Sequence, residues 1–482
     1  MSVTLLSSFQ KQAEMGINTE PNRDFNEPKA VNGLVAQSKK PYLIVCTSPA
    51  TGHFTPILRI VARLIQKGYQ ATFIAGDEFQ AQVEAIGAEC VPTPAMLTPD
   101  IIAEREKIPE GIPRLQFDLK ALFVGQTPGR WETLKKTLLK VRKQHPDDEV
   151  VILTESFYLG HLPLLQGAAL PEGFTKRPGI VNLHAATYIV DSIDTAPFGP
   201  GLPPDYTEEG RARNKAAKDA SAEAVWGDIL AYEKEVNASL GIKNDPGAHL
   251  LPFEKWVTLP DVTLQLCPKS LEYERCDFHP KVKFVGALPR VPVKAGITYP
   301  IWWDDVTRGD KKIVTVTQGT VALDYSNLVI PTLDAMAERD DVLTVAVLGA
   351  KGASLPADYK VPSNARVVDY FPYDAVLEHT DIFVMNAGYG GFIDGVTNGV
   401  PMVLGGGTAD KPEVSARGEY AGVAVNLRTG SASKEQVADG VSKVFADSKF
   451  KERVVEIKKE NEELDALSSI EQHIQQFASH WA

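Results

Sequence analysis

The sequence has little of several features that would each indicate a particular class of protein. It contains four cysteines in 482 residues, Cys46, Cys90, Cys267 and Cys276, at irregular spacings. These spacings match neither a zinc site nor a disulfide framework and fit a reducing compartment. Lys and Arg number 50 against 62 Asp and Glu, so the net charge of −12 offers no basic face for nucleic acid. We therefore expect a cytoplasmic protein that does not bind nucleic acid.

Membrane spans and targeting segments are also missing. No apolar run approaches the length of a membrane-spanning helix. Residues 1–39 are polar and contain four acids, whereas a transit peptide is poor in acids and a signal peptide has an apolar core. We expect a largely disordered tail over residues 1–39, with a short helix over residues 3–15.

Three common phosphate or metal motifs cannot be found. A P-loop requires a Gly-Lys-Ser/Thr run, which is absent, and a dinucleotide fingerprint requires glycine where Ile393 stands. There is no Asp-x-Asp metal motif either. We interpret the acidic pairs Asp147-Asp148 and Asp304-Asp305 as solvated surface, and we expect no metal site.

Alternating apolar runs and amphipathic segments predict an α/β protein. The length exceeds one hydrophobic core and suits two domains. Buried strands are expected over residues 42–46 and 70–75, with helices over 57–67 and 78–86, which is the rhythm of a parallel sheet covered by helices. His53 is then expected in a loop at the C-terminal edge of the first strand, where such folds bind ligands.

The most informative stretch covers residues 385–413. A buried strand over 381–385 is followed by Gly388, Gly390 and Gly391, and then by a helix from about Phe392. A helix N-terminus with unpaired N–H groups favours an anion such as a diphosphate. Glycine-rich turns after strands are common, so the glycines alone do not establish a function.

Taken whole, this block resembles the sugar-nucleotide signature of family-one UDP-glycosyltransferases, which share the two-domain GT-B fold, and it resembles the fungal and bacterial members most. The family's His-x-Gly-Trp-Asn-Ser run, which binds the diphosphate, is matched here by Asn386-Ala387-Gly388-Tyr389-Gly390-Gly391. Asn386 thus replaces a histidine with an uncharged donor, and the last two positions offer only backbone.

The resemblance implies the other donor contacts. The ribose position matches Asp394, and the pair that holds the sugar hydroxyls matches Asp410-Lys411, with Lys411 in place of Gln. The uracil platform matches residues 370–373, where the aromatic is kept and a Gln is lost. The implied donor-binding residues are Gly319, Thr320, Tyr370, Phe371, Tyr373, Asn386, Gly388, Tyr389, Gly390, Gly391, Asp394, Asp410 and Lys411.

The run from Gly52 to Pro56 resembles the family's Gly-His-x-x-Pro, which implies that His53 is the general base. A lone histidine is structural more often than catalytic, so its position carries the prediction. An acid after a later strand orients this histidine in the family, and a strand over 150–157 presents Glu155 where Asp is usual. Because Glu is longer, either the geometry of the pair differs or another group holds His53. Ser156 lacks a Gly-x-Ser-x-Gly elbow and is not expected to be a nucleophile.

Two segments, 94–128 and 186–248, read as long irregular insertions, and such loops build acceptor pockets in folds of this type. The alternative is that their aromatic residues belong to the core. The candidate acceptor-binding residues are Phe117, Phe123, Phe157, His184 and Phe198.

The resemblance covers nearly all of 41–482 and implies two Rossmann-like domains facing across a cleft. We expect an acceptor-binding domain over 40–288, a linker over 289–300, a nucleotide-sugar domain over 301–465, and a C-terminal helix over 466–482 that returns to the N-terminal domain.

The implied activity is inverting, metal-independent transfer of a sugar, glucose by analogy, from a UDP-sugar to a phenol, flavonoid, sterol or hydroxy fatty acid. No cofactor is expected beyond the UDP-sugar co-substrate, and we expect a monomer or weak dimer. A helper protein that binds nucleotide sugar without transferring it is the alternative, favoured by the changes at Asn386 and Lys411. An epimerase of the same fold is disfavoured by Gly52-His53.

Overall fold

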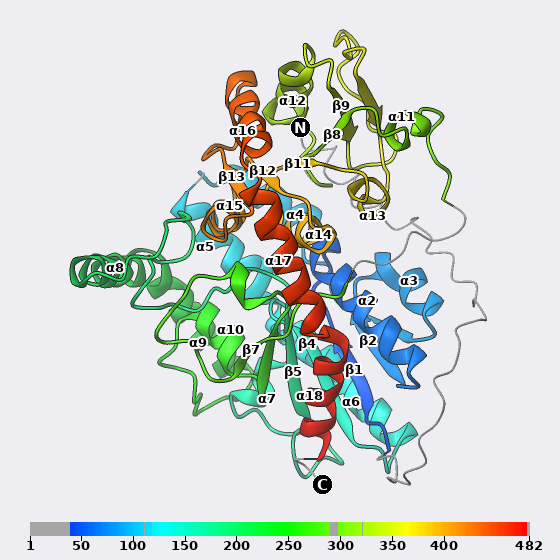
Figure 1. The fold of residues 1–482 in the computed structure, drawn as a ribbon. Helices are drawn as coiled ribbons and strands as arrows, with labels where there is room; N and C mark the ends of the chain where they lie inside the picture. Colours follow the sequence, from blue (N-terminus) through cyan, green and yellow to red (C-terminus); the bar gives the residue numbers. More distant parts are fainter. Residues whose placement is uncertain (1–38, 110, 290–296, 321, 480–482) are drawn as a thin grey trace. The chain divides into compact units, whose positions relative to one another are not determined.

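The computed structural model describes residues 39–109, 111–289, 297–320 and 322–479. Within them the chain forms two sheets covered by helices (Figure 1). The expected helix over 3–15, almost all of the expected tail and most of the expected linker over 289–300 lie outside the described residues.

The first sheet has seven strands in the order β3-β2-β1-β4-β5-β6-β7. Strand β1 pairs in parallel with β2 and β4, and all of its residues are buried. This is expected because helices cover both faces of a parallel sheet. The strands are β1 (Tyr42–Cys46), β2 (Ala71–Ala75), β3 (Glu89–Pro92), β4 (Val150–Glu155), β5 (Gly179–His184), β6 (Val262–Gln265) and β7 (Val282–Phe284).

The second sheet has six strands in the order β10-β9-β8-β11-β12-β13, joined by parallel pairings. Successive side chains of β11 alternate between two cores, with Phe383 and Met385 in one and Ile382 and Val384 in the other. The strands are β8 (Lys312–Thr317), β9 (Val342–Val347), β10 (Ala365–Val368), β11 (Ile382–Met385), β12 (Met402–Leu404) and β13 (Ala424–Asn426).

The helices follow the strands that they cover. On the second sheet, α12 and α16 supply one core, whereas α13, α14, α15 and α17 supply the other. The helices are α2 (Thr51–Gln66), α3 (Gln80–Ala85), α4 (Pro99–Lys107), α5 (Ile112–Asp118), α6 (Thr127–Gln144), α7 (Leu162–Leu165), α8 (Glu208–Ser221), α9 (Gly227–Ser239), α10 (Pro252–Thr258), α11 (Trp303–Thr307), α12 (Val329–Met336), α13 (Tyr373–Leu377), α14 (Tyr389–Asn398), α15 (Lys411–Tyr420), α16 (Lys434–Ala446), α17 (Lys449–Glu463) and α18 (Ala466–Ser479).

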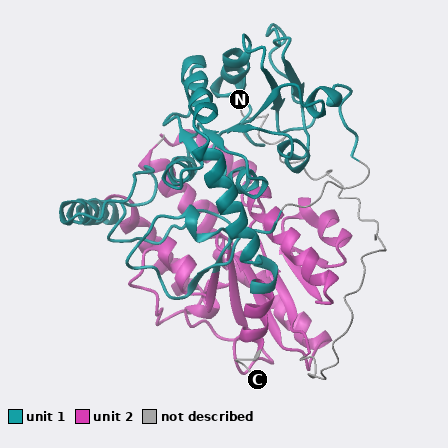
Figure 2. Cartoon of the chain, in the orientation of Figure 1, with its two compact units in different colours: residues 1–12, 184–223, 264–469 teal, residues 13–183, 224–263, 470–482 magenta. Residues whose placement is uncertain are grey.

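The chain divides into two compact units (Figure 2). Unit 1 comprises residues 184–223 and 264–469, and unit 2 comprises residues 224–263 with the described parts of 13–183 and 470–482. The domain boundaries inferred from the sequence stay predictions.

The last helix, α18, packs within unit 2 against the N-terminal part of the chain. Gln475 donates to the hydroxyl of Tyr69 at 2.7 Å, and a Cβ added to Gly179 would lie 2.7 Å from the carbonyl oxygen of Phe477. Strand β5 and α18 are therefore in backbone contact, which confirms the predicted return of the C-terminal helix.

Three local expectations are corrected. The segment 94–128 is largely helical and the second segment is helical over 208–239, because α4 and α8 have the side-chain N-caps Thr98 and Thr207 and α8 is rich in strong helix formers. Residues 186–207 form no helix or strand, as expected. His53 lies in the first turn of α2 rather than in a loop. Helix α14 begins at Tyr389, before the expected Phe392, because glycines in a first turn interrupt no hydrogen bond of the helix interior.

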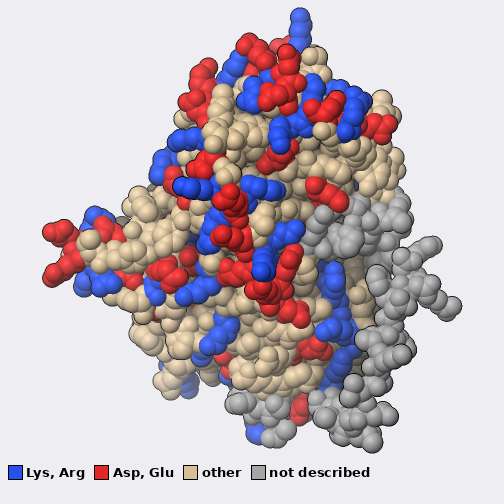
Figure 3. Space-filling model, in the orientation of Figure 1, with Lys and Arg blue, Asp and Glu red and all other residues tan. Residues whose placement is uncertain are grey.

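Charges of both signs are interspersed over the face drawn in Figure 3, and α8 carries acidic and basic side chains together. None of the helices in the described ranges has the length and hydrophobicity that crossing a bilayer requires.

Candidate active site

His53 and Glu155 lie at the C-terminal ends of two neighbouring strands in unit 2. Glu155 is the last residue of β4, and His53 is the third residue of α2, which follows β1. Because β1 and β4 pair in parallel, both side chains reach the same edge of the sheet. The Nδ1 atom of His53 lies 3.0 Å from Oε2 of Glu155. The structure therefore brings the two residues together despite the longer glutamate side chain.

The carboxylate of Glu155 is buried and hydrogen-bonded on both oxygens. Its exposed fraction is 2%, and Oε1 accepts from the hydroxyl of Ser48 at 2.6 Å and from the backbone N–H of Ser48 at 3.3 Å. Burial acts to raise the pKa of Glu155, but the charge of His53 and hydrogen bonds from His53, Ser48 and the N–H of Phe157 outweigh it. The pKa of Glu155 is therefore lowered, and the group is ionised at neutral pH.

The ionised carboxylate beside Nδ1 determines which nitrogen of the His53 imidazole carries the proton. With Nδ1–H donating to Glu155, the neutral ring carries its lone pair on Nε2. The side chain of His53 is 31% exposed. The pair thus has the arrangement of a general base oriented by an acid.

Ser48 is a residue that the sequence reasoning missed. It belongs to the turn between β1 and α2, in which polar residues are ordinary, and its partner lies 107 residues further along the chain. The signal available in the sequence was the hydroxyl of Ser48 just after β1, because β1 is the neighbour of β4, the strand that ends at Glu155.

Arg130 was missed for the same reason. It is buried in α6, and its Nη1 donates to the carbonyls of Phe157 at 3.0 Å and Tyr158 at 2.9 Å. These carbonyls belong to the turn that follows Glu155, so Arg130 fixes the exit of β4. Burial lowers the pKa of Arg130, and the charges of Tyr158 and Glu155 oppose that shift.

An aromatic cluster stands beside His53. The ring of Phe157 lies 4.9 Å from the His53 ring and 5.8 Å from Phe123. Trp256, which the sequence reasoning did not select, lies 5.6 Å from Phe123 and 5.9 Å from Phe157. Phe157 and Phe123 are therefore together at an apolar surface next to the imidazole, while Phe117 lies half-buried on α5.

In unit 1, the loops that follow β8, β9, β11 and β12 meet through their backbones. A Cβ added to Gly349 would lie 2.0 Å from the carbonyl oxygen of Gly319, and one added to Gly406 would lie 2.3 Å from that of Asn386. The side-chain amide of Asn386 donates to the carbonyl of Gln318. Only glycine permits these approaches, so the strand ends form a surface of backbone groups.

Helix α14 begins in this surface with Gly388 as its N-cap, preceded by Ala387 with φ +58°. Glycine provides no side-chain cap, so Gly388 leaves the first-turn N–H groups to other acceptors. A Cβ on Gly391 would lie 2.9 Å from Cε of Met385, whereas one on Gly390 would meet nothing within 4 Å. A helix N-terminus of this form is suited to a phosphate group.

The aromatic residues predicted to bind the donor take different positions. Tyr370 is 37% exposed, whereas Phe371 is buried against Trp303 at 5.1 Å. The hydroxyl of Tyr373 bonds Thr317 at 3.0 Å, and burial raises the pKa of Tyr373 to about 12. An exposed aromatic face is therefore offered by Tyr370, not by Phe371.

The side chain of Tyr389 forms a hydrogen bond within unit 1. Its hydroxyl accepts from the Gln265 side chain at 3.3 Å, and burial raises its pKa well above the ordinary value. The position therefore supplies its backbone, not its ring, to the start of α14.

The polar donor-site residues lie within α14, at the start of α15 and in the loop after β8. Asp394 is half-buried on α14, Asp410 is the N-cap of α15, and Lys411 is the first residue of that helix. Thr320 is half-buried next to Gly319, which has φ +75°. All of them belong to unit 1.

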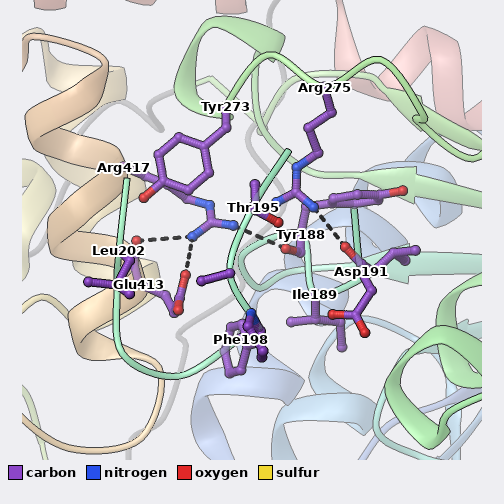
Figure 4. Close-up of a pocket in the computed structure, with 13 residues that line it drawn as sticks. Tyr188, Ile189, Asp191, Thr195, Phe198, Leu202, Tyr273, Arg275, Glu413 and Arg417 are labelled. Atoms are coloured by element: carbon purple, nitrogen blue, oxygen red, sulfur yellow. Dashed lines mark hydrogen bonds and ion pairs between the residues drawn. The ribbon is translucent and has the colours of Figure 1, made fainter. Parts of the chain in front are cut away.

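The two remaining acceptor candidates also belong to unit 1. His184 is fully buried, and its Nε2 lies 2.9 Å from the carbonyl oxygen of Thr187, so its side chain belongs to the core, as the alternative interpretation held. Phe198 instead lines a pocket with Tyr273, Arg275 and Arg417 (Figure 4).

Within the described ranges, one group of side chains offers three metal-ligand atoms: Asp194, Cys276 and Asp277. Asp194 already accepts from the N–H of Cys276 and from Arg211, each at 2.8 Å. Its charge is therefore compensated by the protein.

Comparison with known proteins identifies the family. Residues 331–470 match the family model described as the C-terminal domain of erythromycin biosynthesis protein CIII-like proteins. The chain is 45% identical over 440 residues to UDP-glucosyltransferase 1 of Beauveria bassiana, covering 91% of this chain and 95% of the relative. It is 34% identical over 449 residues to UDP-glucosyltransferase A1 of Starmerella bombicola, covering 92% and 94%.

The solved structure of the calicheamicin glycosyltransferase CalG4 is similar in fold, with a TM-score of 0.68 at 17% identity, covering 92% of this chain and 99% of that one. This similarity confirms the predicted two-domain α/β GT-B fold. With relatives of this identity and coverage, the chain belongs to the family-one UDP-glycosyltransferases.

Proposed function

We propose that this UDP-sugar glycosyltransferase transfers glucose from UDP-glucose to a hydroxyl of a small hydrophobic acceptor, with inversion at the anomeric carbon. The names of the relatives from Beauveria bassiana and Starmerella bombicola support glucose as the sugar. The observation that carries the mechanism is the 3.0 Å contact between His53 and the buried carboxylate of Glu155.

The donor is proposed to bind at the strand ends of unit 1. Uracil stacks on the exposed ring of Tyr370, and the ribose lies near Asp394. The diphosphate meets Thr320 and the N–H groups that open α14, and the sugar hydroxyls meet Asp410 and Lys411. Fixed backbone dipoles stabilise the negative charge that develops on the leaving diphosphate, so the proposal requires no metal ion.

The acceptor is proposed to bind beside His53, against the partly buried rings of Phe157 and Phe123, with the fully buried Trp256 packed behind them. The close ring contacts of this cluster support an apolar acceptor such as a phenol, flavonoid, sterol or hydroxy fatty acid. An apolar surface with one polar group is the usual lining of a small-molecule site.

The proposed reaction is a single displacement. Nε2 of His53 takes the proton of the acceptor hydroxyl while its oxygen bonds to the anomeric carbon. The bond from that carbon to the diphosphate oxygen breaks, its electron pair leaves with UDP, and the product is a β-glycoside. Glu155 stabilises the imidazolium that forms, and its hydrogen bond to Nδ1 keeps Nε2 as the basic nitrogen.

A nucleotide-sugar-binding helper without transferase activity remains the second candidate. The observation that favours it is Asn386, which stands where the family has a histidine and donates to the carbonyl of Gln318. The presence of both His53 and Glu155 favours the enzyme.

We also infer a cytoplasmic location and a monomeric or weakly dimeric state. All four cysteines are described and none forms a disulfide, which supports a reducing compartment.

The proposal is tested by mass-spectrometric detection of transfer. UDP-glucose and other UDP-sugars are paired with hydroxylated aromatics, sterols and hydroxy fatty acids, without added metal and with EDTA. We expect a hexose mass on one acceptor class and a β-linkage by NMR. His53→Ala is expected to reduce transfer by roughly 10³-fold while leaving UDP affinity unchanged. UDP binding without any modified acceptor would instead establish the helper.

A further inference from the structure

The loop over residues 197–202 is held by one carboxylate of α15. Glu413 is the third residue of α15, and its Oε1 accepts from the N–H of Gly199 at 2.7 Å and from the N–H of Gly201 at 3.0 Å. Its exposed fraction is 5%. Hydrogen bonds to an ionised acceptor are stronger than those between neutral groups. One buried oxygen therefore fixes two backbone positions of the loop.

A second contact joins the same loop to the same turn of α15. Gly201 has φ +64°, and a Cβ added to it would lie 2.3 Å from the carbonyl oxygen of Pro412. No other residue type fits this approach without displacing the backbone. The loop is thus docked on the first turn of α15 by hydrogen bonds and by close packing.

The carboxylate is held in place from its other side. Oε2 of Glu413 accepts from Nη1 of Arg417 at 2.7 Å (Figure 4). Nε of Arg417 donates to Glu272, also at 2.7 Å. Nη2 of Arg417 donates to the carbonyl of Tyr188 at 3.1 Å. Glu272 fixes the guanidinium of Arg417. Arg417 therefore keeps the carboxylate of Glu413 in the position from which it accepts the N–H groups of Gly199 and Gly201.

The turn and the loop carry different proposed tasks. The start of α15 presents Asp410 and Lys411, which are proposed to bind the sugar. The loop presents Phe198, a candidate acceptor-binding residue that lines the pocket in Figure 4. The contact through Glu413 therefore joins the loop that carries Phe198 to the first turn of α15, which carries the residues proposed to bind the donor sugar.

We propose that Glu413 is a positioning residue that holds the loop over 197–202 in its acceptor-binding conformation, and that it determines acceptor affinity without contacting the acceptor. This inference rests on the proposed transferase function. It requires that the contact between the loop and the first turn of α15 affects acceptor binding specifically. Kinetics distinguishes such an effect, seen in the acceptor KM alone, from a general loss of stability.

The test compares Glu413→Ala, Glu413→Gln and Gly201→Ala with the wild type. We expect Glu413→Ala to raise the acceptor KM about tenfold, equal to about 1.4 kcal/mol, with kcat and UDP affinity changed less than about twofold. Glu413→Gln keeps an oxygen that accepts from both glycines and is expected to restore most of the affinity. Gly201→Ala breaks the same contact from the loop side, so the double variant with Glu413→Ala is expected to be no weaker than either single one.

The matched control is Glu419→Ala, which removes an exposed carboxylate of the same helix that pairs with Arg428 at 2.7 Å. It is expected to leave the acceptor KM unchanged. An unchanged acceptor KM in Glu413→Ala, or an equal loss of UDP affinity, would overturn the inference. Full additivity of Glu413→Ala and Gly201→Ala would do the same.

A readout without catalysis separates this inference from the proposed function. Chymotrypsin cleavage after Phe198 is expected to accelerate in Glu413→Ala and to return toward the wild-type rate in Glu413→Gln. If the wild type transfers no sugar, the proposed function fails, while proteolysis still shows whether Glu413 holds the loop. Equal cleavage of wild type and Glu413→Ala would mean that it does not.

Discussion

The two sheets end in sites of opposite construction. In unit 2, a buried carboxylate, an imidazole and a serine hydroxyl form a network of side chains at the ends of β1 and β4. In unit 1, the ends of β8, β9, β11 and β12 approach so closely that Gly349 and Gly406 leave no space for a Cβ. A general base must be a side chain that takes up and releases a proton, whereas a diphosphate is stabilised by backbone dipoles that stay fixed. Removing a side chain should therefore damage the first site, and adding one should damage the second.

After His53→Ala, the largest effect is expected from Glu155→Gln. The substitution keeps the size of the side chain but removes the charge that orients Nδ1–H of His53 and stabilises the imidazolium. We expect kcat to fall by about 10²-fold to 10³-fold with UDP affinity unchanged. Steady-state kinetics together with calorimetric titration of UDP measure the two quantities. An undiminished kcat would show that Glu155 is not the orienting acid.

Gly406→Ala tests the other half of the comparison. Its Cβ would lie 2.3 Å from the carbonyl oxygen of Asn386 and 2.7 Å from Cβ of Lys411, so the loops must separate. We expect UDP affinity to fall by roughly tenfold, as for the loss of one or two hydrogen bonds. Gly52→Ala in unit 2 is the matched control, because a Cβ there meets nothing within 4 Å. Equal UDP affinity in the two variants would contradict the proposed donor site.

Ser48→Ala removes one of the donors that hold Glu155. The hydroxyl bond of 2.6 Å is lost, while His53 and the N–H of Ser48 still donate to the carboxylate. We expect kcat to fall roughly threefold to tenfold, a smaller loss than in Glu155→Gln. Ser48→Thr keeps a hydroxyl and is expected to recover part of the rate. A rate equal to that of the wild type in Ser48→Ala would show that the hydroxyl adds nothing to the orientation of Glu155.

The smallest effect concerns stability against acid. The pKa of Glu155 in the folded protein lies below its ordinary value of 4.5, so its charge stabilises the fold above pH 4.5. That contribution is lost as the pH falls through the lowered pKa. The difference in free energy of unfolding between wild type and Glu155→Gln is therefore expected to shrink on acidification below pH 4.5, as measured by denaturant titration. A difference that stays constant from neutral to acidic pH would contradict the lowered pKa.

Sequence reasoning succeeded where a local pattern determines the structure. The run over 42–46 was predicted as a strand and is β1, because five consecutive apolar positions suit a sheet buried on both faces. The order of the strands and a family resemblance together selected His53 and Glu155, and the structure places them in contact.

It failed where the determining contact is distant or polar. The partner of Ser48 is 107 residues away, and no local pattern shows that Arg130 donates to Phe157 and Tyr158. Helix α8 was missed because it is mostly polar and buries only Gly210 and Asn214, so it lacks the apolar periodicity by which helices were sought. Its N-cap and composition were the signals that remained.

Helix α18 has a consequence for how the protein is made. Gln475, which bonds Tyr69, is 406 residues further along the chain, and the backbone of Phe477 covers Gly179. A ribosome synthesises β1, β2 and β5 long before it supplies the helix that covers them. Contacts between such distant segments form slowly, and partly covered sheets expose apolar surface in the meantime. Completion of unit 2 is therefore among the last events of folding, although its strands are among the first to be synthesised.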